Sequence, residues 1–190
     1  MKTILQIGYG YWGKKIYKNL INFNNYKILI FDPYVKSNRN LSFIKNINNV
    51  NPDFVIISTT VKHHEFYIQK FINNKIPIYV EKPLLNFYKE NLSYFDYNKK
   101  IFTGYVYLYN SFIIKLKKLI LKEKSKLLFL KFERKNLGPI RKDVDVLYDL
   151  ASHDLSILSY LFENKKFSII NVTKQKIVSK NRYDQYKLHF

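Results

Sequence analysis

Three glycines near the start of the chain have the spacing of a phosphate-binding turn. Gly8, Gly10 and Gly13 form a G-x-G-x-x-G pattern directly after a short apolar run. In such a turn the first glycine permits a tight bend, the second lets the backbone approach a pyrophosphate, and the third lets a helix pack closely on the strand. The helix N-terminus then offers N–H groups and partial positive charge to the phosphates. A purely structural strand-to-helix turn is the alternative.

An acidic residue follows the glycines at the distance that a dinucleotide fingerprint uses. Asp32 closes the next apolar run, at roughly the 20-residue separation expected for a carboxylate that binds the adenosine ribose. A carboxylate there repels a 2′-phosphate, so the sequence favours NAD over NADP as cofactor. Because Asp32 precedes a proline, a turn-forming role is also open.

A lysine near the middle of the chain is a candidate for substrate binding. Glu81, Lys82 and Pro83 close an apolar run that is typical of a buried strand. In an open parallel sheet, ligands bind at the carboxyl ends of the strands, where Lys82 would lie. Taken alone, an E-K-P tripeptide is a weak signal, and a solvated lysine before a proline is the simpler interpretation.

A carboxylate and an imidazole lie four residues apart in the second half of the chain. Asp149 and His153 fall on a predicted helix, and that spacing places them on one face. A carboxylate beside an imidazole fixes its tautomer and raises its basicity, so His153 could take a proton from a hydroxyl group. An ordinary surface pair on a helix would have the same spacing.

The elements that must position these residues alternate along the first half of the chain. Strands are predicted over residues 3–7, 27–31, 54–58, 76–83 and 100–108, and helices over 11–22, 63–73 and 86–97, with a short helix over 41–47. Strands alternating with helices of this length indicate βαβ units and a parallel sheet covered on both faces. This is the context that a dinucleotide-binding glycine turn requires.

After Gly104 the pattern changes. Helices are predicted over 110–122 and 144–162, and strands over 126–135, 167–178 and at the end of the chain. We therefore expect an α/β fold. Residues 1–104 form a Rossmann domain with a doubly wound parallel sheet, and residues 105–190 form an incomplete α+β domain with an open antiparallel sheet.

Composition narrows the classes of function. The 190 residues include no cysteine, which excludes disulfides, thiol nucleophiles and thiolate metal sites. The formal net charge is +19, but the lysines are spread along the chain, so compositional drift is favoured over a nucleic-acid surface. No run approaches the roughly 18 apolar residues of a membrane span. We expect a cytoplasmic protein with no nucleic-acid, membrane or metal partner.

Four motifs together resemble the signatures of one enzyme family. They are "GYGYWG", "STTVKHHEFYIQKFINNKIPIYVEKPL", "TGYVYLYN" and "RKNLGPIRKDVDVLYDLASHDLSIL". In this order they resemble the Gfo/Idh/MocA oxidoreductases, and most of all the branch that acts on sugar nucleotides and surface polysaccharides. The resemblance implies hydride transfer between the nicotinamide of NAD and a hydroxyl-bearing carbon of a sugar or nucleotide sugar.

The resemblance also implies roles for individual residues. Lys82 would position substrate and nicotinamide, and Asp149 and His153 would form the acid/base pair, with His153 exchanging the proton. Asn110 and Arg134 would face the substrate. The cofactor would be bound by Gly8, Tyr9, Gly10, Tyr11, Trp12, Gly13, Asp32, Ser58, Thr59, Thr60, His64, Glu81 and Lys82.

The resemblance further implies a longer second sheet than this chain contains. Members of the family continue beyond the equivalent of Phe190, so we expect a truncated form or a fragment. A homo-oligomer is expected for the full-length family fold rather than for the shortened chain. The alternative to an active enzyme is a non-catalytic nucleotide-binding remnant or scaffold.

Overall fold

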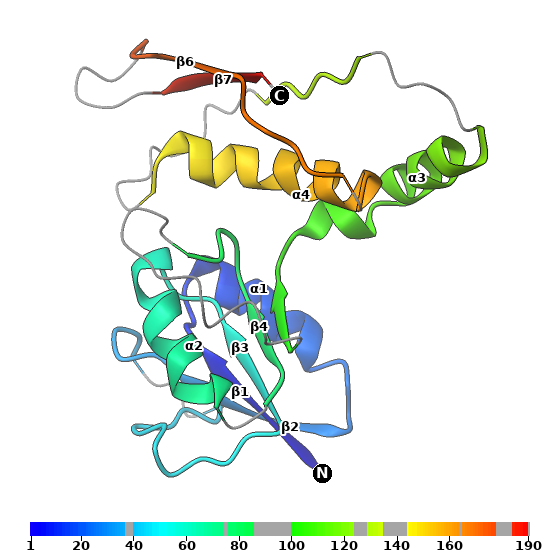
Figure 1. Ribbon diagram of the computed structural model, residues 1–190. Coiled ribbons are helices and arrows are strands. Elements are labelled where there is room, and N and C mark those ends of the chain that lie inside the picture. The colour runs from blue at the N-terminus through cyan, green and yellow to red at the C-terminus, as the bar shows by residue number, and fades with distance from the viewer. Residues whose placement is uncertain are drawn as a thin grey trace. The chain divides into compact units, whose positions relative to one another are not determined.

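The structure is a computed structural model that describes residues 1–36, 40–73, 76–85, 100–123, 129–134, 144–163, 165–177 and 184–189. The chain divides into two compact units, Met1–Gly104 and Tyr105–Phe190. Each unit has its own secondary structure (Figure 1). The first carries the glycine turn and the E-K-P segment, and the second carries the Asp149–His153 segment.

The first unit is built on a five-stranded parallel sheet. Its strands are β1 (Lys2–Ile7), β2 (Tyr26–Phe31), β3 (Phe54–Ile57), β4 (Ile78–Val80) and β5 (Ile101–Thr103), in the order β2-β1-β3-β4-β5. The order reverses direction between β1 and β3, and such a switch point opens a crevice at the carboxyl ends of the strands. This sheet confirms the predicted α/β class.

Helices cover both faces of that sheet, because the connections between its parallel strands cross over the faces. On one face, α2 (His64–Ile72) packs Ile68 and Phe71 into a core that contains Leu5, Ile7 and residues of β3 and β4. On the other face, α1 (Tyr11–Leu20) meets β1 through Gly13 and Gln6. A short 3₁₀ turn, η1 (Val61–His63), leads from β3 into α2.

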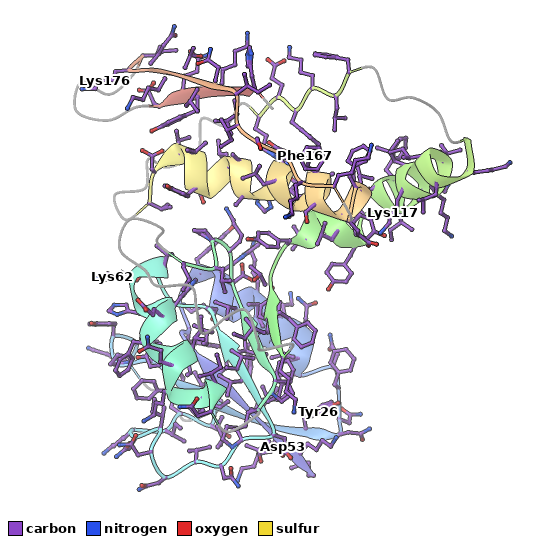
Figure 2. The ribbon with its side chains drawn as sticks, viewed as in Figure 1. Tyr26, Asp53, Lys62, Lys117, Phe167 and Lys176 are labelled. Atoms are coloured by element: carbon purple, nitrogen blue, oxygen red, sulfur yellow. The ribbon has the colours of Figure 1, made fainter. Side chains whose placement is uncertain are left out.

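The amino ends of the strands lie at the opposite end of the sheet from the glycine turn and the E-K-P segment. Asp53 joins the starts of β1 and β3, because its backbone N–H donates to the Thr3 carbonyl at 2.9 Å and its Oδ2 accepts from the Thr3 N–H at 2.7 Å. Figure 2 shows Asp53 and Tyr26 at this end. The bond fixes the register of the inner strands without contributing to the candidate site.

One predicted element of the first unit is wrong, and another is shorter than predicted. Residues 40–50 contain no helix; Phe43 instead forms a parallel bridge with Ile30, and the Ile30 N–H donates to the Ser42 carbonyl. The edge strand β2 offers unpaired backbone groups. Hydrogen bonds to these groups stabilise the extended segment more than a helix of two turns would be stabilised, because so short a helix is unstable alone. The strand predicted over 100–108 ends at Thr103. The helix predicted over 86–97 lies outside the described residues.

In its described residues, the second unit contains two α-helices and a two-stranded antiparallel sheet. A 3₁₀ turn, η3 (Val106–Tyr109), precedes α3 (Ser111–Glu123). A short π-helical segment, η4 (Leu147–Ala151), runs directly into α4 (Ser152–Leu161). Strands β6 (Asn171–Gln175) and β7 (Gln185–His189) pair antiparallel. Of the strand predicted over 126–135, the described residues 129–134 form none.

The helices of the second unit are joined by side chains on their facing surfaces. Lys117 of α3 pairs with Glu163 just beyond α4, and its ammonium lies 4.0 Å from the centre of the Tyr160 ring. Ile157, Leu158 and Leu161 are the buried apolar residues of α4. Within the part of the chain that the structure describes, no helix has the length and apolar character needed to cross a membrane.

Candidate active site

The three glycines of the turn differ in how closely the rest of the protein packs against them. Gly8 has φ +97°, and a Cβ there would lie 2.7 Å from the backbone carbon of Ser58. A Cβ at Gly13 would lie 2.4 Å from the Gly8 carbonyl oxygen. Around Gly10, by contrast, no atom of a described residue lies within 4 Å of the Cβ position, apart from its chain neighbours and the backbone of its own helix. Packing within the protein therefore explains Gly8 and Gly13, while Gly10 leaves open space that a ligand could occupy.

A buried glutamine holds the glycine turn closed. Gln6 Nε2 donates to the carbonyl oxygens of Gly8 at 3.1 Å and Gly13 at 2.8 Å. Ser58 Oγ also donates to the Gly8 carbonyl, at 2.9 Å. Sequence reasoning included Ser58 but missed Gln6. The available signal was a polar residue inside an otherwise apolar strand, because a buried amide must find partners.

The helix that follows the turn has an uncapped N-terminus. Gly10 is the N-cap of α1 and has no side chain that could cap the helix, and the first turn holds no acidic residue. The first N–H groups of a helix have no partner within the helix, so an anion in front of Gly10 would find donors at this end. Lys15 adds positive charge nearby, with its ammonium 4.4 Å from the Tyr11 ring centre and 4.7 Å from that of Trp12.

Asp32 bonds to the glycine turn itself. Its Oδ2 accepts from the Tyr9 N–H at 2.7 Å, and its Oδ1 accepts from the Tyr34 N–H at 2.9 Å. The first bond ties the end of β2 to the turn, and the second forms the turn at Pro33 that the sequence left open. Each carboxylate oxygen accepts more than one hydrogen bond, so Asp32 retains acceptor capacity for a ribose hydroxyl. The Tyr9 ring packs elsewhere, edge-on to Tyr17 and Phe43.

His64 links the segments that follow β3 and β4. The side chain is buried, with Nε2 3.1 Å from the Thr59 carbonyl oxygen and Nδ1 3.0 Å and 3.1 Å from those of Pro83 and Leu84. Both ring nitrogens therefore face the backbone, and His64 acts on the candidate site through the segments it joins. Thr60, at the start of η1, is exposed.

Glu81 is buried at the carboxyl end of β4. Its Oε1 accepts from the Tyr79 hydroxyl at 2.8 Å and its Oε2 from the Trp12 indole N–H at 2.9 Å. Burial raises the pKa of Glu81, while hydrogen bonds from Tyr79, Trp12 and the Lys82 backbone act in the opposite direction. Lys82 is half-buried and precedes a cis peptide bond to Pro83.

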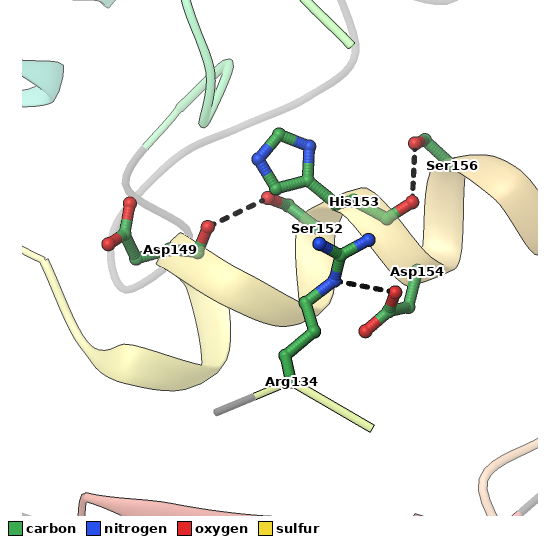
Figure 3. Close-up of polar contacts among 6 residues, drawn as sticks. All are labelled: Arg134, Asp149, Ser152, His153, Asp154 and Ser156. Carbon is green, nitrogen blue, oxygen red and sulfur yellow. Dashed lines mark hydrogen bonds and ion pairs between the residues drawn. The ribbon is translucent and has the colours of Figure 1, made fainter. Parts of the chain in front are cut away.

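In the second unit, His153 belongs to a cluster of side chains (Figure 3). It lies in α4 and is 8% exposed, and the Tyr107 ring meets the imidazole edge-on with centres 4.9 Å apart. The Arg134 guanidinium lies 4.5 Å from the Tyr107 ring centre and donates from Nε to Asp154 Oδ1 at 2.7 Å. Sequence reasoning missed Tyr107, because nothing distinguishes it in a segment rich in aromatic residues.

Two further predicted site residues have visible structural roles. Asn110 Oδ1 accepts from the Phe112 N–H at 2.9 Å, so Asn110 is the N-cap of α3. Asp149 lies in η4, and its carbonyl oxygen accepts from Ser152 Oγ at 3.5 Å. Substrate contact by Asn110, and support of His153 by the Asp149 carboxylate, stay predictions.

The first unit has a Rossmann-like α/β fold with a glycine turn after β1, and solved structures of other proteins share this fold. No family model and no curated sequence matches the chain. Among solved structures, myo-inositol dehydrogenase from Corynebacterium glutamicum matches 98% of this chain and 63% of its own, with a TM-score of 0.71 and 16% identity. Myo-inositol dehydrogenase from Lactobacillus casei, in complex with NAD(H) and myo-inositol, matches 98% of this chain and 62% of its own, at TM-score 0.73 and 15% identity.

A third structure extends the likeness beyond inositol dehydrogenases. GenD2 from gentamicin A biosynthesis, in complex with NAD, matches 97% of this chain and 60% of its own, with TM-score 0.70 and 13% identity. At such identities the likeness establishes a shared fold. The chain spans about three-fifths of the length of these dehydrogenases.

Proposed function

We propose that the chain is a Gfo/Idh/MocA oxidoreductase that transfers a hydride between NAD and a hydroxyl-bearing carbon of a sugar, cyclitol or nucleotide sugar. The observation that carries the proposal is the open space at Gly10 in front of the uncapped N-terminus of α1. Packing among the described residues gives no reason for a glycine there, whereas a pyrophosphate does. The fold shared with NAD-bound dehydrogenases supports the same interpretation.

The residues of the first unit fit a bound NAD. The pyrophosphate would lie against the Gly8–Gly13 turn, with N–H groups of the first turn of α1 as donors. Asp32 would accept from the adenosine ribose with the acceptor capacity that Tyr9 and Tyr34 leave. The same carboxylate opposes a 2′-phosphate, so NAD is preferred to NADP.

The chemistry divides between the cofactor and the side chains. When bound, NAD accepts or supplies the hydride. His153 takes the hydroxyl proton during oxidation and returns it in the reverse direction. Lys82 supports the developing negative charge on the substrate oxygen. Arg134, held by Asp154 and Tyr107, keeps further guanidinium donors for substrate oxygens.

The comparisons and the net charge support the proposed substrate class. The Lactobacillus casei dehydrogenase was solved with myo-inositol, a polyol whose ring carbons bear hydroxyl groups. A net charge of +19 attracts anionic ligands, which favours a nucleotide sugar over a neutral sugar for this chain.

The proposal is tested by titrating the protein with NAD(H) and NADP(H), and then following nicotinamide reduction with myo-inositol, neutral sugars and UDP-sugars. We expect binding of NAD, weaker binding of NADP, and turnover with at least one polyol. Replacement of His153 by Ala should abolish turnover and leave NAD affinity within about twofold, since the imidazole acts on the substrate and not on the cofactor. A protein that binds no dinucleotide would overturn the proposal.

A further inference from the structure

The buried carboxylate of Glu81 connects the first turn of α1, to which the proposed function assigns the pyrophosphate, with strand β4. One oxygen accepts from Trp12, which lies in the first turn of α1, and the other accepts from Tyr79 on β4. Glu81 is 6% exposed, whereas Trp12 is 42% exposed. The hydrogen bond thus anchors a side chain of the fingerprint helix at the buried end of β4.

The register of the sheet shows to which of its faces Tyr79 and Glu81 point. Gln6, Ile56 and Tyr79 are register partners on β1, β3 and β4, and Gln6 faces α1 through its bond to Gly13. Because side chains alternate along a strand, Tyr79 and Glu81 both point to the face that α1 covers. The indole of Trp12 therefore reaches across β3 to meet Glu81 at the end of β4.

Gly104 lies beside the Tyr79 hydroxyl and the Glu81 carboxylate. A Cβ at Gly104 would lie 2.4 Å from the Tyr79 hydroxyl and 3.2 Å from Glu81 Oε1. The absence of a side chain at Gly104 thus permits the Tyr79 hydroxyl to reach Glu81. Glycine follows β5 directly, so the backbone itself forms one wall beside the carboxylate.

The chemistry of the donors determines what Glu81 can do. An indole N–H is a donor only, and a buried carboxylate is costly unless hydrogen bonds satisfy it. The hydrogen bond between Glu81 and Trp12 therefore has two effects: it helps to satisfy the buried carboxylate, and it fixes the indole. Trp12 is the second residue of α1, and its backbone N–H is one of the donors available to a phosphate.

We propose that Glu81 is a positioning residue that acts on the dinucleotide through Trp12, by fixing the indole and with it the first turn of α1. The inference rests on the proposed function for its ligand. It differs from direct contact between Glu81 and the cofactor, which the family resemblance implies. Under our proposal, removal of Glu81 has no effect on the cofactor once Trp12 has been replaced.

The first test needs no cofactor, because Trp12 is the only tryptophan of the chain. We compare acrylamide quenching and anisotropy of Trp12 fluorescence in the wild type, Glu81→Ala and Glu81→Gln. Ala should increase quenching at least twofold and lower the anisotropy. Gln should restore wild-type values, since its Oε1 accepts from the indole and its Nε2 donates to the Tyr79 oxygen. Glu65→Ala, which removes a carboxylate from the surface of α2, should change neither.

The second test is a double-mutant cycle on NADH affinity with Glu81→Ala, Trp12→Phe and the double variant. Each single change should weaken NADH binding about five- to twentyfold, and the double variant should be no weaker than the worse single variant. Circular dichroism of each variant confirms that the fold is retained. If Glu81→Ala fails to fold, Glu81→Leu and Trp12→Phe complete the same cycle.

The outcomes separate the two proposals. Losses of NADH affinity that multiply in the double variant, or unchanged Trp12 fluorescence in Glu81→Ala, would overturn the positioning role. A wild-type protein that binds no dinucleotide would overturn the proposed function and the cofactor part of this inference. The quenching comparison would still decide whether Glu81 fixes the indole.

Discussion

Arg134 donates from Nε to the carboxylate of Asp154 at 2.7 Å, and both side chains are largely buried, at 22% and 17% exposure. The pair joins a residue predicted to face the substrate to the neighbour of the proposed proton acceptor, His153. Burial raises the pKa of Asp154 and the hydrogen bond from Arg134 lowers it, so the two effects oppose each other. Arg134 is thereby held against Tyr107, which itself contacts His153.

Asp154→Asn should destabilise the protein, because it leaves the partly buried guanidinium without its charged partner. We expect the free energy of unfolding to fall by about 1–3 kcal/mol, measured by urea denaturation. Glu163→Gln is the matched control, since Glu163 is 61% exposed in its pair with Lys117, and exposed pairs contribute about 0–1 kcal/mol. Equal losses in the two variants would show that burial of the Arg134 pair carries no extra stability.

Tyr107 should position His153 through its ring and not through its hydroxyl. Tyr107→Phe keeps the edge-on contact with the imidazole and should retain most of kcat, whereas Tyr107→Leu should lower kcat about fivefold, because aromatic pairs contribute roughly 1 kcal/mol beyond burial. KM for NAD should be unchanged in both. Comparable kcat values for the Leu and Phe variants would exclude Tyr107 as a positioning residue.

The glycine turn offers a matched pair of substitutions. Gly10→Ala places a methyl group in open space at φ −71°, so stability should change by less than about 0.5 kcal/mol. NAD affinity should nevertheless fall about tenfold or more, because the methyl group occupies the path of the pyrophosphate. Gly13→Ala should instead destabilise the fold by about 1–3 kcal/mol, since its Cβ would overlap the Gly8 carbonyl.

These two variants are compared by calorimetric NAD titration and by denaturation. Loss of stability without loss of affinity at Gly10 would mean that the open space is not a ligand site. Such a result would leave the fold assignment intact and remove the main support for a bound dinucleotide.

Asp32→Ser should relax the discrimination between the two nicotinamide cofactors. Serine removes the negative charge that opposes a 2′-phosphate, but it also removes one of the two acceptor oxygens that bind Tyr9 and Tyr34. We therefore expect weaker NAD binding together with a smaller ratio of NADP to NAD dissociation constants. Asp53→Ser, at the amino ends of the strands, is the control. An unchanged ratio in Asp32→Ser would exclude Asp32 from the ribose site.

The sequence predicted those elements whose local pattern and tertiary environment agree. The runs at β1 and β3 are buried on both faces, and the glycine spacing predicted the turn between β1 and α1. The prediction of a helix over 41–47 was wrong because this segment pairs with the edge of β2. Such pairing joins residues distant in the sequence, and the local spacing of apolar residues carries no information about it. Gln6 and Tyr107 were missed for a related reason, since their partners are distant in sequence or belong to the backbone.

The free energy of unfolding should depend on pH through the titration of Glu81. Burial raises its pKa, and hydrogen bonds from Tyr79, Trp12 and Lys82 offset this only in part. With the folded pKa above the unfolded one, the folded protein binds more protons between the two values. The free energy of unfolding therefore falls as the pH rises through that window, and the loss is complete above the folded pKa.

Glu81→Gln removes this titration while the amide keeps partners for Trp12 and Tyr79. The difference in unfolding free energy between Glu81→Gln and the wild type should be smallest at acidic pH and should grow in favour of the variant as the pH rises through the window. Denaturation at a series of pH values measures it, and the difference cancels contributions from Asp154, whose pKa burial also raises. A difference that stays constant with pH would mean that the Glu81 carboxyl has the same pKa in the folded and unfolded chains.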